Sequence, residues 1–288
     1  MDASVGQHVP ALHQLIGESC QSVRDSDCVE NDSATEQLNT AKTSTPVAVV
    51  SAPSFHFGGV VPPEFFIGRG EELHEAEKAV RGGNNMLLVG ELRAGKTSFG
   101  KTLIHRIMRR EGNDVLGAYV NVQQWPSLTV ETFFEHTILS LIGEIARQVF
   151  AVKFTSLASD NPARGRSDLA GDDGFTSFLD AYRFVRGRTY QQGDVAPAAF
   201  RIEEFAEVSD ELMEIIRARG WNRCFIFYDE ANRLGREQSV DMLLGHQEAL
   251  SVSGLTAIYA ASPAMIETGH GRKLQEWFVH QVRMGPFN

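Results

Sequence analysis

The sequence has few cysteines, a deficit of basic charge and no long apolar run, and each shortage excludes a class of protein. Its 288 residues include three cysteines, Cys20, Cys28 and Cys224, which lack the spacing of metal ligands or of a disulfide framework. Lysine and arginine number 27 against 37 acidic residues, and this excess of negative charge does not support a nucleic-acid surface. No segment approaches the roughly 20 apolar residues of a membrane span, and no signal-peptide pattern opens the chain. We therefore expect a cytoplasmic protein without a membrane partner.

Apolar residues are also scarce before residue 55. Residues 1–54 carry seven acidic residues against two basic ones and are rich in Ser, Thr, Asp and Gln. Such a segment cannot bury enough apolar surface to offset the entropy lost on ordering. We expect a disordered acidic tail over residues 1–54 and a folded core over residues 55–288.

The core alternates apolar runs with helical patterns. The runs predict strands at residues 85–89, 115–122, 224–228 and 256–261. Helical spacing predicts helices at residues 71–80, 99–111, 131–150, 200–220 and 239–250. This alternation predicts an α/β fold, with a parallel sheet covered by helices on both faces. Residues 154–199 are rich in Gly and Asp with weak periodicity, and we interpret them as an insertion or flexible loop.

A glycine-rich turn joins the first predicted strand to a helix. Its sequence GELRAGKT, residues 90–97, matches G-x-x-x-x-G-K-[ST] without deviation. In this pattern, backbone N–H groups and the helix N-terminus form a cradle for phosphate oxygens. Lys96 is expected to reach the β- and γ-phosphates, and the Thr97 hydroxyl to bind Mg²⁺. The strand and helix on either side disfavour the alternative of a simple turn with a solvated lysine.

Hydrolysis would also require an acidic group for the metal and a base for water. The segment CFIFYDEANRL ends an apolar run with Asp229 and Glu230. Ligands of open α/β sheets bind at the carboxyl ends of the strands, so we assign Asp229 to the magnesium shell and Glu230 to the attacking water. Ser262 ends the next strand. It either bonds the water or the γ-phosphate, or it is an ordinary serine at a strand end.

Four segments together resemble a known ATPase family: FFIGRGEEL, GELRAGKTS, FIFYDEANRL and AIYAASP. They are similar to the AAA+/STAND superfamily of P-loop ATPases, closest to its prokaryotic STAND-like and origin-recognition-like cores. The resemblance implies a three-layer core with strand order 5-1-4-3-2, in which WFVHQVRM is the last strand. It also implies that Phe66, Ile67 and Gly68 lie against the adenine. The implied phosphate-side residues are Gly90, Glu91, Leu92, Arg93, Ala94, Gly95, Lys96, Thr97 and Ser98.

The chain also departs from the family pattern. Gly70 stands where an acidic residue is usual, and Arg93 is either the basic residue common in such loops or a solvated arginine. The family continues after a phrase like VRMGPF into a helical lid, whereas this sequence ends at Asn288. A lid is therefore expected to be absent, whether the sequence is cut or the product is short. Arg272 is either an arginine finger acting on a neighbouring copy or a surface residue.

The expected function is ATP binding with slow Mg²⁺-dependent hydrolysis in a regulatory STAND/AAA+-type switch. A GTP-binding switch would show an N-K-x-D element, which the sequence lacks. The alternative is a non-hydrolysing scaffold that binds nucleotide and contacts a protein partner through the tail or residues 154–199. An ATP-dependent homo-oligomer is a further expectation. The segment AYRFVRGRTY, residues 181–190, either meets an anionic partner or is a solvated loop.

Overall fold

The computed structural model describes residues 59–110, 114–125, 128–159, 161–164, 166–189, 201–235, 254–267, 272, 275 and 278–285. They belong to the compact unit Gly59–Asn288. The predicted tail over residues 1–54 and the predicted helix over residues 239–250 lie outside the described residues. Among the helices that can be described, none combines the length and apolar character needed to cross a membrane.

Five parallel strands form the centre of this unit. They are β1 (Met86–Gly90), β2 (Val115–Asn121), β3 (Arg223–Asp229), β4 (Leu255–Ala261) and β5 (His280–Met284). Their order in the sheet is β2-β3-β4-β1-β5. This confirms the order 5-1-4-3-2, read from the other edge, and it confirms that the last strand pairs with the strand of the glycine-rich loop. β1 and β4 are buried along their whole length because helices cover both faces.

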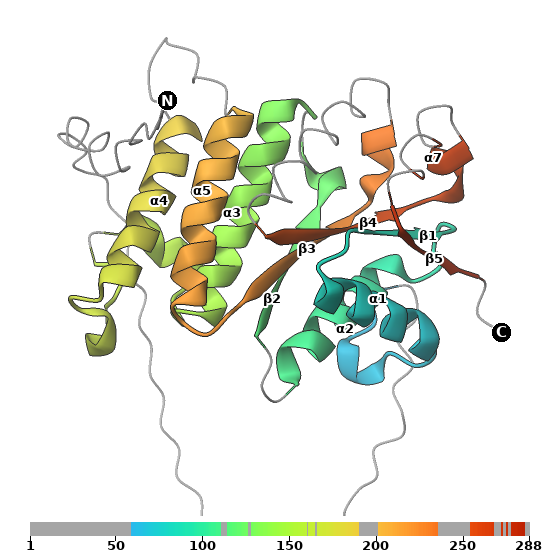
Figure 1. The fold of residues 1–288 in the computed structure, drawn as a ribbon, viewed down its shortest axis with the longest axis horizontal. Helices are drawn as coiled ribbons and strands as arrows, with labels where there is room; N and C mark the ends of the chain where they lie inside the picture. Colours follow the sequence, from blue (N-terminus) through green and yellow to red (C-terminus); the bar gives the residue numbers. More distant parts are fainter. Residues whose placement is uncertain are drawn as a thin grey trace, which may run out of the picture. The chain divides into compact units, whose positions relative to one another are not determined.

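Helices cover the two faces of the sheet. The longer ones are α1 (Gly70–Gly82), α2 (Lys96–Arg109), α3 (Val130–Gln148), α4 (Asp173–Thr189) and α5 (Ile202–Arg217), followed by the short α7 (Pro263–Glu267). Figure 1 shows α1 and α2 on one side of the sheet and α3, α4 and α5 on the other. Two separate apolar clusters follow this division, one beneath α1 and α2 and one beneath α3, α4 and α5. The predicted three-layer arrangement is thus confirmed.

Short 3₁₀ turns link these elements. They span Pro63–Phe65, Val122–Gln124, Phe154–Ala158, Ser167–Leu169 and Ala231–Gly235. The first packs against α2, and the last lies between the ends of β3 and β4. The helix predicted over residues 71–80 spans Gly70–Gly82 in the structure, and Gly83 in a left-handed conformation ends it.

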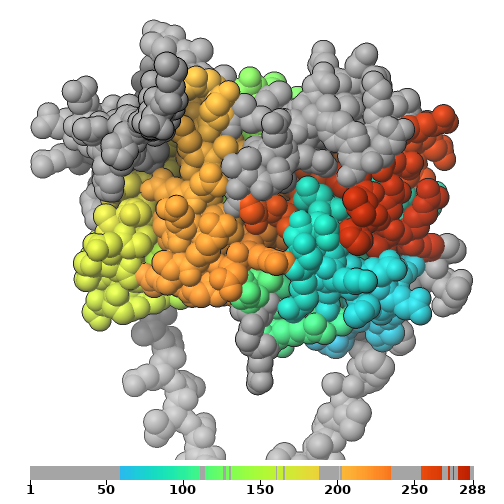
Figure 2. Space-filling model, viewed as in Figure 1, coloured from blue at the N-terminus to red at the C-terminus, as the bar shows by residue number. Residues whose placement is uncertain are grey.

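Helix α4 lies within the predicted insertion or flexible loop at residues 154–199 and corrects the flexible-loop interpretation for Asp173–Thr189. Its apolar side chains recur at helical spacing and are buried: Phe175, Phe178, Leu179, Tyr182 and Val185. In Figure 2 the yellow atoms of this segment lie directly against the orange atoms of α5. The helical period was missed because Gly174 and Gly187 interrupt it and because Gly and Asp precede it. Within the basic and aromatic segment, Tyr182 is a core residue.

Candidate nucleotide site

The glycine-rich loop connects β1 to α2 as the motif requires. Gly95 has a φ of 87°, a left-handed conformation that suits glycine, and α2 begins at the next residue. Arg93 also has a positive φ, of 66°. Glu91, Leu92 and Arg93 are exposed, whereas Ala94 and Lys96 are buried. The loop therefore presents one open side at the positive end of a 14-residue helix, where the dipole favours an anion.

The Lys96 side chain folds back onto this loop. Its ammonium nitrogen donates to the carbonyl oxygens of Gly90 at 2.8 Å and Glu91 at 3.0 Å. The residue is 6% exposed, and two carbonyl oxygens are weak partners for a buried charge. Phosphate oxygens accept the same donor and carry the opposite charge, so the lysine is suited to exchange its carbonyl contacts for a phosphate.

Asp229 joins the two sequence motifs. The Thr97 hydroxyl donates to Asp229 Oδ2 at 2.6 Å, and the backbone N–H of Glu230 donates to Asp229 Oδ1 at 3.0 Å. The carboxylate is almost fully buried, with 1% of the residue exposed. While the hydroxyl proton is directed at Asp229, the lone pairs of the Thr97 oxygen remain available. A hydroxyl and a carboxylate oxygen in contact are suitable donors for a hard cation such as Mg²⁺.

Tyr119 was not predicted and lies in the same cluster. Its hydroxyl donates to Asp229 Oδ2 at 2.6 Å, so this single oxygen accepts two hydroxyl donors. Burial raises the pKa of Tyr119 far above its usual value, and the hydrogen bond to Asp229 and the negative charge of that residue raise it further. Nothing in the sequence of one apolar strand shows which neighbouring strand it pairs with, which is why this residue was missed.

Glu230 adopts an unusual backbone conformation beside Asp229. Its φ is 54°, in the left-handed region that a side chain disfavours, and such outliers concentrate at functional sites. Asn232 Nδ2 donates to Glu230 Oε2 at 3.2 Å, and Asn232 Oδ1 accepts from the backbone N–H of Ser262 at 2.5 Å. Asn232, which was not predicted, therefore connects the acid at the end of β3 to the end of β4. Ser262 takes part in this contact through its backbone.

The segment predicted to meet the adenine is tied to the start of α2. The Ser98 hydroxyl oxygen accepts from the backbone N–H of Val61 at 2.9 Å. Phe66 is partly buried against the α1 and α2 cluster, and Gly68 has a left-handed φ of 82°. Ile67 is 85% exposed, so it does not form part of a preformed apolar wall. Arg272 is also exposed.

The strand order, the loop between β1 and α2 and the acidic pair at the end of β3 are together the arrangement of a P-loop nucleoside triphosphatase core. No family model and no curated protein sequence matches the chain. The chain resembles the solved structure of the Aeropyrum pernix Orc1 protein in complex with DNA, with 15% identity, a TM-score of 0.44 and coverage of 77% of this chain and 46% of that one. It also resembles a Walker-type ATPase of Pyrococcus abyssi, with 16% identity, a TM-score of 0.44 and coverage of 79% and 56%. The chain spans about half the length of these two proteins.

Proposed function

We propose that the chain binds ATP with Mg²⁺ at residues 90–97 and hydrolyses it slowly, as a regulatory switch of the STAND/AAA+ type. The observation that carries this proposal is the 2.6 Å hydrogen bond between Thr97 Oγ1 and Asp229 Oδ2, because it joins the phosphate loop to the acidic strand end. These residues are 132 positions apart in the sequence. A glycine turn with an unrelated acidic strand end would not produce this contact.

Each residue has a defined part in the proposed reaction. Backbone N–H groups of the loop hold the phosphates, and Lys96 turns from its carbonyl partners to the β- and γ-phosphate oxygens. Thr97 and Asp229 would hold Mg²⁺, which when bound neutralises charge on the transferred phosphoryl group. Glu230 orients the attacking water and accepts its proton. Asn232 keeps the Glu230 carboxylate in place.

Nucleotide recognition outside the phosphates is assigned to the segment before α1. Phe66, Ile67 and Gly68 would meet the adenine, and the hydrogen bond from Val61 to Ser98 supports this role by fixing a nearby part of the segment to α2. Because Ile67 is exposed, we expect it to become buried when ATP binds. Protection of this segment from hydrogen exchange on addition of Mg-ATP would report the change.

Two substitutions test the proposal. Lys96→Ala should lower ATP affinity by at least about a hundredfold, since it removes the cation that pairs with the phosphates. Glu230→Gln should keep ATP affinity and lower phosphate release by about a hundredfold or more, since it removes a general base. Calorimetry with Mg-ATP and a phosphate-release assay give the two readouts, and Lys78→Ala on the exposed side of α1 is the matched control.

A non-hydrolysing scaffold is the alternative outcome. It would bind ATP through Lys96 but release no phosphate above background in either the parent chain or the Glu230→Gln variant. ATP affinity unchanged in Lys96→Ala would contradict both versions. Sedimentation with and without Mg-ATP tests the proposed homo-oligomer, and Arg272→Ala should lower activity only if an oligomer forms.

A further inference from the structure

Tyr119 is held in position by neighbours on two elements, β3 and α2. It lies opposite Phe227 in the parallel pairing of β2 with β3, and the two rings are stacked with centroids 6.2 Å apart and an interplanar angle of 8°. The Lys101 ammonium nitrogen of α2 lies 5.3 Å from the Tyr119 ring centroid, within cation–π distance. The ring can therefore move little, and its hydroxyl stays directed at Asp229.

The hydrogen bonds of the Asp229 carboxylate come from three separate parts of the fold. Oδ2 accepts from Thr97 on α2 and from Tyr119 on β2, and Oδ1 accepts from the Glu230 backbone N–H at the end of β3. Buried carboxylate oxygens without such donors would be left unsatisfied, which costs free energy. In the proposed function Thr97 also binds the metal, whereas Tyr119 is assigned only the hydrogen bond from its hydroxyl to the carboxylate.

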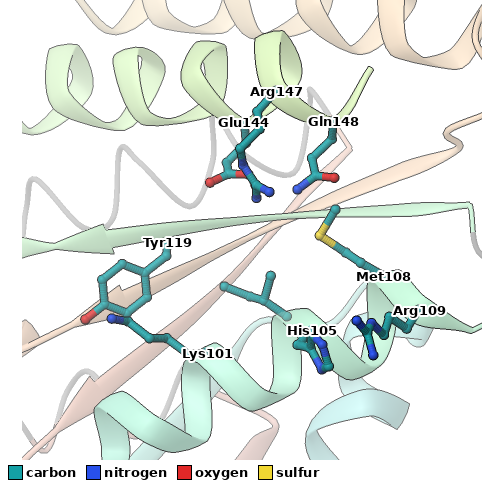
Figure 3. Close-up of a pocket in the computed structure, with 9 residues that line it drawn as sticks. Lys101, His105, Met108, Arg109, Tyr119, Glu144, Arg147 and Gln148 are labelled. Carbon is teal, nitrogen blue, oxygen red and sulfur yellow. The ribbon is translucent and has the colours of Figure 1, made fainter. Parts of the chain in front are cut away.

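Figure 3 shows Tyr119 and Lys101 close together at one end of a cavity of about 430 Å³ between α2 and α3. Met108 from α2 and Glu144, Arg147 and Gln148 from α3 also line the cavity. The Tyr119 ring therefore borders open space on one side, while its hydroxyl reaches a carboxylate that is 1% exposed. Removing the hydroxyl alone leaves the stacking with Phe227 and the cation–π contact in place.

We propose that Tyr119 is a positioning residue of the metal site, which holds the Asp229 carboxylate in the orientation that Mg²⁺ requires. This inference rests on the proposed function. Partners that orient a metal ligand commonly account for tenfold to about a hundredfold in metal affinity, because an oriented ligand loses less freedom on binding. The effect should be confined to the metal, since the hydroxyl that is removed donates to Asp229, whereas residues 90–95 would hold the phosphates.

The test compares two tyrosine variants. Tyr119→Phe removes the hydroxyl that bonds Asp229. Tyr228→Phe removes an equivalent buried hydroxyl on the neighbouring strand, where it shares a 3.1 Å hydrogen bond with Thr137. ATP affinity is measured by calorimetry first in EDTA and then over a series of Mg²⁺ concentrations. Thermal unfolding of each variant checks that both are folded.

We expect the two variants to differ in the Mg²⁺ concentration that they require. Tyr119→Phe should bind ATP normally in EDTA and need about tenfold more Mg²⁺ for half of the metal-dependent gain in affinity. Tyr228→Phe should need the same Mg²⁺ concentration as the parent. An unchanged requirement in Tyr119→Phe, or an equal shift in both variants, overturns the inference and leaves the proposed function standing. Failure of the parent chain to bind ATP overturns both.

Discussion

The two faces of the sheet differ in what their helices contribute. The face beneath α3, α4 and α5 holds the larger apolar cluster and most of the aromatic stacking, including Tyr228 on Tyr259 at 5.0 Å and Phe134 against Phe205 at 4.6 Å. The face beneath α1 and α2 has a smaller cluster, and its helix α2 carries Lys96, Thr97 and Ser98. The face beneath α3, α4 and α5 therefore mainly buries apolar side chains, whereas the face beneath α1 and α2 positions polar groups of the candidate site.

Helix α2 differs from the helices of the opposite face because one of its glycines lets it pack closely on strand β3. Gly100 faces Phe227 so closely that an added Cβ would lie 2.3 Å from its ring. This small residue lets α2 lie against β3, and the Thr97 hydroxyl one turn earlier consequently reaches Asp229. The comparison suggests that substitutions on the α3 side should alter stability alone, and that substitutions under α2 should alter stability and binding together.

The largest expected effect is on the α3 side. Phe134→Ala removes a fully buried ring and should lower the free energy of unfolding by about 3–5 kcal/mol. The ATP affinity of the folded protein should stay within about twofold of the parent, since this ring packs against Phe133 and Phe205 in the cluster beneath α3, α4 and α5. Urea denaturation and calorimetry measure the two quantities. A parallel loss of ATP affinity would show that the two faces are not separable.

The second effect concerns the contact between α2 and β3. Gly100→Ala should lower the free energy of unfolding by about 1–3 kcal/mol, because the Phe227 ring is buried and cannot move aside freely. ATP affinity should fall as well, because Lys96 and Thr97 shift with the helix. Gly187→Ala on α4 is the matched control, since nothing lies within 4 Å of an added Cβ there. An equal response of both variants would contradict the close-approach explanation.

A third substitution separates catalysis from binding at the ends of β3 and β4. Asn232→Ala frees the Glu230 carboxylate and leaves the Ser262 N–H without its acceptor. Phosphate release should fall by about tenfold or more, because the water is then poorly oriented, while ATP affinity should hold. Single-turnover phosphate release at saturating ATP measures the effect. A fall in affinity with unchanged release would place Asn232 in nucleotide binding instead.

The smallest expected effect is at the start of α4. Asp172 Oδ1 accepts a hydrogen bond from the Phe175 N–H at 2.9 Å, and Oδ2 accepts one from the Arg219 guanidinium. The hydrogen bond from Phe175 is the main cause that lowers the pKa of Asp172 below its usual value. Asp172→Ala should lower the free energy of unfolding by about 1 kcal/mol at neutral pH. The pKa of Asp172 is lower in the folded state than in the unfolded state. The stabilisation by its carboxylate is therefore present above about pH 4 and is lost as the pH falls through the folded-state pKa.

Denaturation at pH 7 and at about pH 3 therefore checks the Asp172 prediction. The difference between Asp172→Ala and the parent should shrink at the lower pH. Asp173→Ala is the control, because this neighbouring side chain is exposed. A difference that does not depend on pH would show that packing, and not the carboxylate, accounts for the effect.

Several features of this protein follow from short stretches of its sequence. The glycine-rich loop, its flanking strand and helix, and the acidic pair after an apolar strand could all be predicted, because each depends on local backbone preference and local apolar period. The helix over residues 173–189 could not, because its glycines weaken the period and its burial depends on α3 and α5. Its stability comes from packing more than from intrinsic preference.

The sequence by itself thus determined the glycine-rich loop, the strands and the choice of Lys96, Thr97, Asp229 and Glu230 as candidate site residues. Only the tertiary structure decided that Tyr119 shares an oxygen of Asp229 with Thr97 and that Asn232 connects Glu230 to Ser262. The physical reason is that strand order and register bring together side chains from strands distant in the chain. A local pattern carries no information about which strand will be its neighbour.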